Sequence, residues 1–322
     1  MWMLRLAIVS ISLLVGCMKE PLTQENLEDS IPVHKTPSED IDKPGATKSE
    51  EIVNETQPII TLKDSRTLEI DKIIELQQLG YSTNFEIYLT ALKNIAKELA
   101  RGTNTSSGYD QQMVLDKISD NGQIIKGSPR IILKESELVD NILSVSNSGG
   151  SVFLPIYITH SSYNVEDIPS LDDVIVASFT TYFNSSETGR NKNIELSANA
   201  LNNIIVGNGD YFSFNTMVGE RTEARGYQSA PEIINKKRVM GIGGGICQTS
   251  STLFNAVDQI GVRITERHHH SLNVGYVPTG RDATVSYGTL DFKFQNTSGA
   301  PFLIKTVYRH NALTIEISTT QQ

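Results

Sequence analysis

A cysteine, a histidine cluster and two aspartates follow one another in the C-terminal half in an order that suits thiol chemistry. Cys247 comes directly after three glycines, Gly243–Gly245, and precedes a segment whose apolar residues recur at helical spacing. At the start of a helix, the helix dipole and free amides favour a thiolate and lower the pKa of a cysteine. Histidines 268–270 and then Asp282 and Asp291 come later in the chain. This order predicts a nucleophile, a base and a residue that orients the base.

Two interpretations of these residues stay open. In the first, Cys247 is the nucleophile, His270 its base, and Asp282 or Asp291 the orienting acid, as in papain-like and transglutaminase-like thiol enzymes. In the second, Cys247 is a buried structural or ligand-pocket residue, His270 is a hydrogen-bonded strand histidine, and the aspartates cap turns. The sequence leaves undecided whether the protein is an enzyme.

The first residues predict export and lipid attachment. Arg5 precedes the apolar run 6–15, which has the layout of a signal peptide and is shorter than a membrane-spanning helix. Residues 14–17, Leu-Val-Gly-Cys, resemble the lipobox of bacterial lipoproteins. That resemblance implies cleavage before Cys17 and a lipid on its sulfur. We therefore expect a signal peptide over 1–16 and an extracytoplasmic protein held to the outer face of the cell membrane. The alternative is an ordinary signal peptide with an incidental cysteine.

Residues 17–60 are expected to form a disordered acidic tether. Between Lys19 and Glu55, ten acidic residues outnumber four lysines, so most of the net charge of −9 lies in this segment. Few large apolar residues occur in it, and such segments cannot bury enough surface to fold. An acidic chain without a basic stripe argues against nucleic acid as a partner.

The rest of the chain predicts an α+β fold with a largely antiparallel sheet in its C-terminal part. We expect a helical segment over 65–101, where Ile87, Ala91, Ile95 and Leu99 recur four residues apart and Ser82 or Asn84 caps the start. A small α+β lobe is expected over 105–168. A mixed domain over 171–320 follows, with the Cys247 helix packed on its sheet and Thr249, Ser250 and Ser251 as candidate caps.

The region from about Phe179 to Phe302 resembles the VanW family. The matching stretches occur in order and at family spacing; they are Phe212–Asn215, Val218–Thr222, Arg225–Tyr227, Ala230–Pro231, Gly243–Leu253, Glu266–Arg267, His270–Ser271, Tyr276–Ala283 and Asp291–Asn296. The preceding lobe resembles the peptidoglycan-binding-like module that often stands before this domain. The resemblance implies a cell-envelope protein whose partner is peptidoglycan or its stem peptides, without implying a particular reaction.

The expected site is a cleft between residues 243–251 and 268–276. Its candidate binding residues are Arg221, Arg225, Tyr227, Gly244, Gly245, Gln248, Ser250, Ser251, His268, Ser271 and Tyr276. Arg221, Arg225, Glu232 and Arg267 are expected either to form ion pairs or to grip a peptide carboxylate. No cofactor and no metal are expected. On a strand, only His268 and His270 would share a face. No third ligand occurs at a spacing typical of a metal site.

Overall fold

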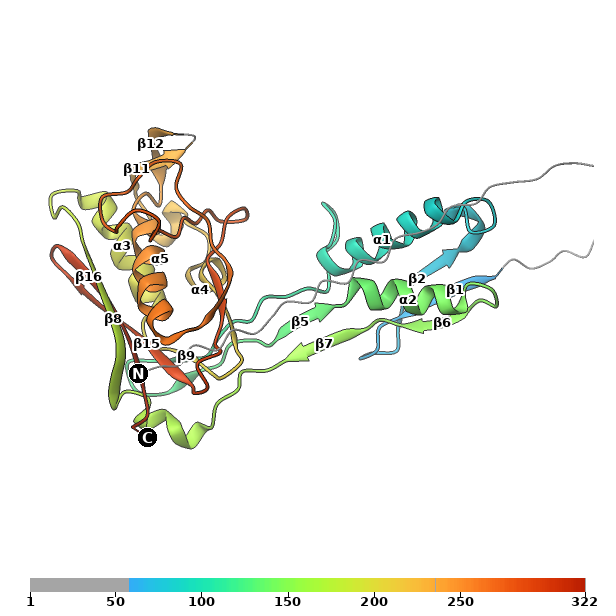
Figure 1. Ribbon diagram of the computed structural model, residues 1–322, viewed down its shortest axis with the longest axis horizontal. Helices are drawn as coiled ribbons and strands as arrows, with labels where there is room; N and C mark the ends of the chain where they lie inside the picture. The colour runs from blue at the N-terminus through green and yellow to red at the C-terminus, as the bar shows by residue number, and fades with distance from the viewer. Residues whose placement is uncertain (1–57, 235, 322) are drawn as a thin grey trace, which may run out of the picture. The chain divides into compact units, whose positions relative to one another are not determined.

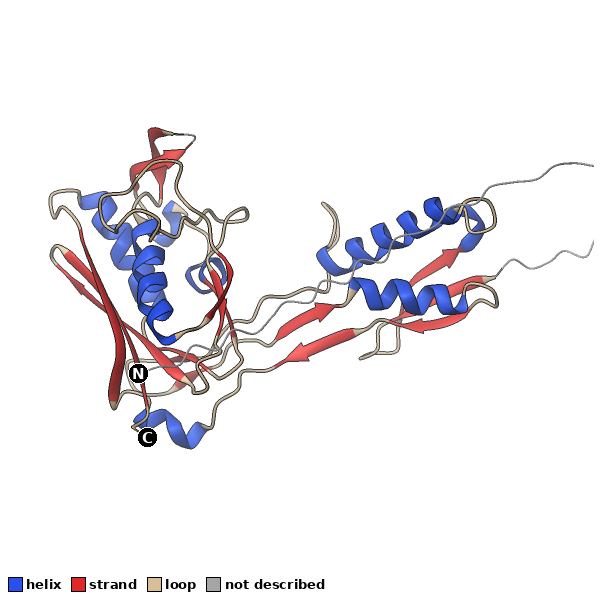
Figure 2. Cartoon of the chain, in the orientation of Figure 1, coloured by secondary structure: helices blue, strands red, loops and turns tan. Residues whose placement is uncertain are grey.

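The computed structural model describes residues 58–234 and 236–321 (Figures 1 and 2). The expected signal peptide, Cys17 and residues 17–57 of the expected tether lie outside the described residues. Within the described ranges, no helix combines the length and the apolar character needed to span a bilayer.

The N-terminal lobe has two helices packed on a small sheet. Its three-stranded sheet has the order β2 (Ile70–Glu75), β1 (Ile59–Lys63), β6 (Gly150–Phe153), with β1 antiparallel to β2 and parallel to β6. Helices α1 (Phe85–Arg101) and α2 (Glu135–Val145) contact each other, and a separate pair joins β5 (Arg130–Leu133) to β7 (Ile156–Thr159). Short 3₁₀ turns occur at Leu76–Leu79 and Val165–Ser170. One core unites residues from β1 to Leu154, including the buried Tyr88 and Leu92.

Two boundaries expected from the sequence are wrong. Only 85–101 of the expected helical segment is α-helical, capped by the Asn84 side chain, because residues 70–75 pair with β1 as a strand and tertiary pairing overrides local spacing. The expected tether also reaches too far, since β1 begins at Ile59.

The C-terminal domain is built on a six-stranded sheet whose described pairings are all antiparallel. Its strand order is β4 (Ile124–Ile125), β3 (Lys117–Ile118), β9 (Ile204–Val206), β15 (Phe302–Arg309), β16 (Ala312–Thr319), β8 (Val174–Tyr182). Strands β3 and β4 come from within the expected 105–168 lobe. That lobe is therefore divided: Met113 and Leu115 belong to the C-terminal core, whereas Leu133 to Leu154 belong to the N-terminal one.

Helices α3 (Thr188–Leu201) and α5 (Ile246–Val257) cover this sheet and contact each other (Figure 1). Helix α5 contacts β8 and β16, while α3 contacts β15. Eleven of the twelve α5 residues are buried, because the helix lies between the sheet and the segments that follow it. The α+β class, the antiparallel sheet and the packing of the Cys247 helix are thus confirmed.

A second small sheet and a hairpin complete the domain. Strand β14 (Lys293–Gln295) pairs with β10 (Tyr211–Ser213) and β13 (Arg263–Glu266), and β11 (Ser229–Ile234) pairs with β12 (Lys237–Ile242). Helix α4 (Phe214–Val218) and 3₁₀ turns at Glu223–Arg225 and Asp258–Ile260 link these strands. In the core of the domain, Phe212 and Phe294 stack with ring centroids 4.7 Å apart, and Phe292 is tilted by 45° relative to Phe294.

Candidate active site

The glycine loop sets Cys247 in the first turn of α5. Gly245 is the N-cap residue with φ +108°, and Gly243 has φ +99°, which are conformations that favour glycine. Space is the second requirement: a Cβ on Gly245 would lie 2.8 Å from Cγ of Arg190, and one on Gly243 would lie 3.0 Å from Cβ of Arg221. The loop therefore lets two arginine stems pass directly beside the residues that precede the cysteine.

The expected caps are not caps. No side chain caps α5, and Thr249, Ser250 and Ser251 lie inside the helix because it begins at Ile246, before them. Their hydroxyls instead bond nearby groups: Thr249 pairs with Ser197 at 2.8 Å, and Ser251 donates to the carbonyl of Cys247 at 2.7 Å.

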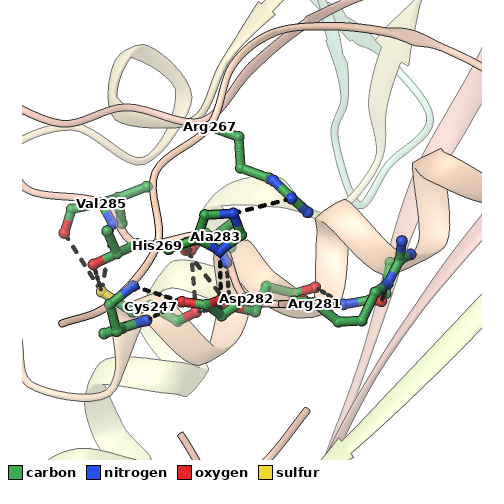
Figure 3. A network of polar contacts seen from close by, with 12 residues as sticks. Cys247, Arg267, His269, Arg281, Asp282, Ala283 and Val285 are labelled. Carbon is green, nitrogen blue, oxygen red and sulfur yellow. Dashed lines mark hydrogen bonds and ion pairs between the residues drawn. The ribbon is translucent and has the colours of Figure 1, made fainter. Parts of the chain in front are cut away.

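The sulfur of Cys247 contacts the segment 284–285 (Figure 3). The amide N–H of Val285 donates to Sγ at 3.5 Å, and the Thr284 hydroxyl lies 3.5 Å from it. The thiol form has an acceptor as well, since the Val285 carbonyl oxygen lies 3.4 Å from Sγ. Both protonation states of the sulfur can therefore form hydrogen bonds here.

His270 lies between the thiol and an aspartate. Its Nδ1 is 2.7 Å from Oδ2 of Asp282, and its backbone N–H donates to the same oxygen at 2.7 Å. Both side chains are buried, with 6% and 10% of their surfaces exposed. The imidazole also lies close enough to Cys247 for each group to shift the pKa of the other. Because Asp282 engages Nδ1, Nε2 is the ring nitrogen left free for a further partner.

Charges in this group are mutually stabilised. Burial raises the pKa of Cys247. The neighbouring His270, the Val285 N–H and the Thr284 hydroxyl lower it by more than burial raises it, so the pKa of the thiol is lowered overall. Burial lowers the pKa of His270, but Cys247 and Asp282 raise it by more, so the pKa of the imidazole is raised overall. Each shift is toward the charged form of its group, so this contact favours a thiolate–imidazolium pair more than the same two side chains would in water.

Asp282 binds two neighbouring histidines. Its Oδ1 is 2.8 Å from Nδ1 of His269, whose Nε2 lies 3.2 Å from a nitrogen of Arg267. Burial raises the pKa of Asp282, and these histidines lower it more, to about 2. The expectation that only His268 and His270 share a face is wrong, because β13 ends at Glu266 and the following chain does not alternate as a strand does.

Polar contacts tie α5 to the segment that carries Asp282. The Ala283 N–H donates to the Ser251 hydroxyl at 2.9 Å, and Ser250 donates to the Ala283 carbonyl. A buried Gln248 holds the other side of the helix, donating to the Thr181 hydroxyl at 2.9 Å and to the Tyr182 carbonyl at 3.0 Å. These three candidate residues thus position the cysteine and the aspartate relative to each other.

Two arginines and a tyrosine lie near enough to Cys247 for its charge to affect their pKa values. Arg190 donates to Oε1 of Gln248 at 2.6 Å and lies over the Tyr276 ring at 5.9 Å. Burial and the nearby Cys247 charge raise the pKa of Tyr276, and the nearby Ser251 side chain partly opposes this increase. Burial lowers the pKa of Arg221, and the charges of Tyr227 and Cys247 partly oppose that effect.

Other expected residues have local partners. The Arg225 guanidinium donates to the backbone carbonyls of Val218, at 2.8 Å, and Glu220. His268 lies 2.9 Å from Glu266, and the Ser271 hydroxyl accepts from the Lys236 N–H at 3.0 Å.

Two further candidates belong to the domain's framework. Tyr227 is buried in the core, and a Cβ on Gly244 would lie 2.5 Å from the Ala230 carbonyl oxygen.

Asp291 serves α4 and not the histidine. Its carboxylate accepts from the Ser213 hydroxyl at 2.6 Å and from the amides of Asn215 and Phe292 at 2.9 and 2.8 Å. Of the two aspartates left open by the sequence, Asp282 is therefore the one bonded to His270. Within the described residues, no group of three or more His, Cys, Asp or Glu side chains is arranged to hold a metal ion.

Three contacts of the site were missed from the sequence. Arg190 lies in the first turn of α3, within the polar stretch 184–193 that the sequence indicates as a turn. Thr284 and Val285 carry no catalytic side-chain pattern. Arg190 is a cation near the start of a helix, where a negative residue is more usual, but so is Lys192, and no local signal separates the two.

Comparison with known proteins assigns the domain. Residues 189–318 match the family model described as "VanW like protein". The C-terminal domain thus contains a VanW-like region. The chain is 40% identical over 190 residues to the uncharacterized protein YoaR of Bacillus subtilis, covering 58% of this chain and 63% of YoaR.

A second relative is the vancomycin B-type resistance protein VanW of Enterococcus faecalis, 30% identical over 117 residues, or 35% of this chain and 42% of that protein. The chain thus spans less than two thirds of either relative. No solved structure matches it. Cys247, His270 and Asp282 all lie within the matched VanW residues.

Proposed function

We propose that the VanW domain is a thiol enzyme that acts on peptide amides of the cell envelope, with Cys247 as nucleophile, His270 as base and Asp282 as the residue that orients the base. The observation that carries this proposal is His270, whose Nδ1 lies 2.7 Å from Asp282 and whose imidazole lies close enough to Cys247 to lower the pKa of the thiol. Thiol and serine acyl-transfer enzymes place three side chains in series: a nucleophile, a base and an acid that orients the base.

The reaction follows from these positions. The thiolate attacks the amide carbonyl carbon, and the Cys247 N–H, one of the first amides of α5, is available to the developing oxyanion. As the C–N bond breaks, the His270 imidazolium gives its proton to the leaving amine. Water or a second amine, deprotonated by His270, then attacks the thioester. A carboxylic acid or a new amide leaves, and the proton returns to the cysteine–histidine pair.

The decisive test is alkylation of Cys247 by iodoacetamide as a function of pH. The full-length chain with Cys17→Ser carries only one thiol. We expect alkylation with a midpoint well below the ~8.5 of an ordinary thiol. His270→Gln should move the midpoint above that of the parent chain, because burial then acts without the compensating imidazolium.

His269→Gln is the matched control. His269 contacts the same carboxylate through the other oxygen, but its ring lies toward Arg267, so the low midpoint should persist. A midpoint at or above that of a free thiol in the parent chain, unchanged by His270→Gln, would refute the enzyme. A thioester adduct on Cys247, detected by mass spectrometry after incubation with peptidoglycan fragments, would identify the acyl donor.

The alternative is a module that binds peptidoglycan without cutting it. An unpartnered cation beside the cysteine, Arg221, supports anion binding whether or not the thiol reacts. In that case Cys247→Ser protein should sediment with purified sacculi as the parent chain does, and no adduct should form. Failure of the parent chain to sediment would count against this alternative.

The envelope location is part of the proposal. The lipobox-like residues 14–17 support a lipid on Cys17, and the name of the Enterococcus relative refers to resistance against an antibiotic. Labelled palmitate should be incorporated into the parent protein and not into Cys17→Ser, which should be released from the membrane. Unlabelled parent protein in the medium would refute the anchor.

A further inference from the structure

Arg221 is a buried cation without a partner. Neither terminal nitrogen of its guanidinium, Nη1 nor Nη2, has a hydrogen-bond partner among the described residues, and both are shielded from solvent. The group is held between aromatic rings, 5.6 Å from the centre of Phe214 and 5.8 Å from that of Tyr287. Burying an uncompensated charge is costly, so this arrangement needs an explanation.

Neighbouring arginines of the domain do not share this condition. Arg190 donates to Gln248, Arg225 donates to two backbone carbonyls, and Arg281 bonds Asn255 and Asp258 at 2.8 Å each. The charge of the Asp291 carboxylate also acts on Arg221, but that carboxylate accepts hydrogen bonds from Ser213, Asn215 and Phe292. The missing partner of Arg221 is therefore not supplied from these groups.

The position of Arg221 relates it to the reactive cysteine. The charge of Cys247 acts on the guanidinium, and the Arg221 stem lies against Gly243 in the loop that leads into α5. The unpartnered cation therefore lies near the cysteine, where its charge and that of the sulfur interact. A guanidinium fork matches carboxylates and phosphates. A single unpaired cation fits a monoanion better than a phosphate dianion, because Arg190 and Arg225 are already engaged.

We propose that Arg221 binds a carboxylate of the acyl donor, so that the substrate is an acidic peptide with a free carboxylate near the amide that Cys247 attacks. This inference rests on the proposed thiol enzyme and adds its specificity. In the free protein the cation is held by aromatic faces; in the complex the carboxylate bonds Nη1 and Nη2 and so orients the amide.

The test compares charged and neutral alkylating reagents of matched length. Full-length Cys17→Ser protein is treated with iodoacetate and iodoacetamide, and with 3-iodopropionate and its amide. We expect the ratio of the carboxylate to the amide rate to fall at least about tenfold in Arg221→Met for one or both lengths, since hydrogen bonds to charged groups have this magnitude. Arg221→Lys, which retains the charge but not the fork, should recover part of the ratio.

Arg309→Gln, which removes an exposed cation at the end of β15, is the matched control and should leave both ratios unchanged. Unchanged ratios in Arg221→Met, with a low iodoacetamide midpoint, would overturn the carboxylate site and leave the thiol enzyme intact. An ordinary iodoacetamide midpoint in the parent chain would instead refute the enzyme. Protection of Cys247 by inorganic phosphate but not by acetate would also overturn the choice of a carboxylate.

Stability separates binding from a structural role. Because the guanidinium is buried without hydrogen bonds, Arg221→Met should unfold at the same or a higher urea concentration than the parent chain. A lower midpoint for Arg221→Met, together with unchanged reagent ratios, would assign Arg221 to the structure and not to a ligand.

Discussion

Replacing Asp282 by asparagine should remove a defined part of the acid sensitivity of folding. The pKa of Asp282 falls from 3.8 to about 2 in the folded protein, because the bonds from His269 and His270 outweigh the effect of burial. This difference corresponds to about 2 kcal/mol of folding free energy. Asp282 is a suitable group for this conversion, since only 10% of its side chain is exposed.

The sign follows from the direction of the shift. A carboxylate whose folded pKa lies below its unfolded value stabilises the fold at pH above about 4, and this contribution is lost as pH falls toward 2. About half of it should be gone by pH 3. Asp282→Asn lacks the contribution at every pH, so its free energy of unfolding should lie below that of the parent chain at pH 5 and converge with it at pH 2.

Urea unfolding followed by circular dichroism at pH 5, 4, 3 and 2.5 measures this convergence in the full-length Cys17→Ser background. Asp173→Asn, at an exposed position before β8, provides the control and should stay parallel to the parent chain. A constant difference between Asp282→Asn and the parent chain across these values would show that the carboxylate is not held ionised by the two histidines. The proposed orienting role would then fail with it.

Three further substitutions test the fold around the site, each by urea unfolding at pH 7. Gly245→Ala should destabilise the fold by about 1–3 kcal/mol, because Gly245 has a positive φ and its added Cβ would contact the Arg190 stem. Gly261→Ala should cost less, because Gly261 also has a positive φ but has open space around it. Equal costs would contradict the packing argument. Phe292→Ala, at a fully buried position, should cost about 3–5 kcal/mol, and a cost below about 1 kcal/mol would contradict its place in the core. Asn84→Ala removes the cap of α1 and should cost about 1 kcal/mol; no loss would mean that water replaces the cap.

Sequence alone determined the local features of this protein. Helical spacing after Gly245 set Cys247 at a helix start, and the apolar and polar patterning indicated an α+β fold with an antiparallel sheet; both are confirmed. These properties depend on neighbouring residues and on periodicity, which a sequence displays directly. The wrong prediction that Thr249, Ser250 or Ser251 caps α5 also came from local sequence, since Ser and Thr near a helix start usually cap it.

Only the tertiary structure decided which residues meet. The sequence offered both Asp282 and Asp291 as partners of His270. Long-range packing bonds Asp282 to His270 and Asp291 to Ser213 and Asn215. Strands 117–118 and 124–125 belong to the C-terminal sheet because residues 117–118 pair with β9, and the local sequence does not predict this long-range pairing. The unpartnered state of Arg221 is likewise a property of its surroundings: whether a buried cation has a partner depends on side chains brought together from distant parts of the chain.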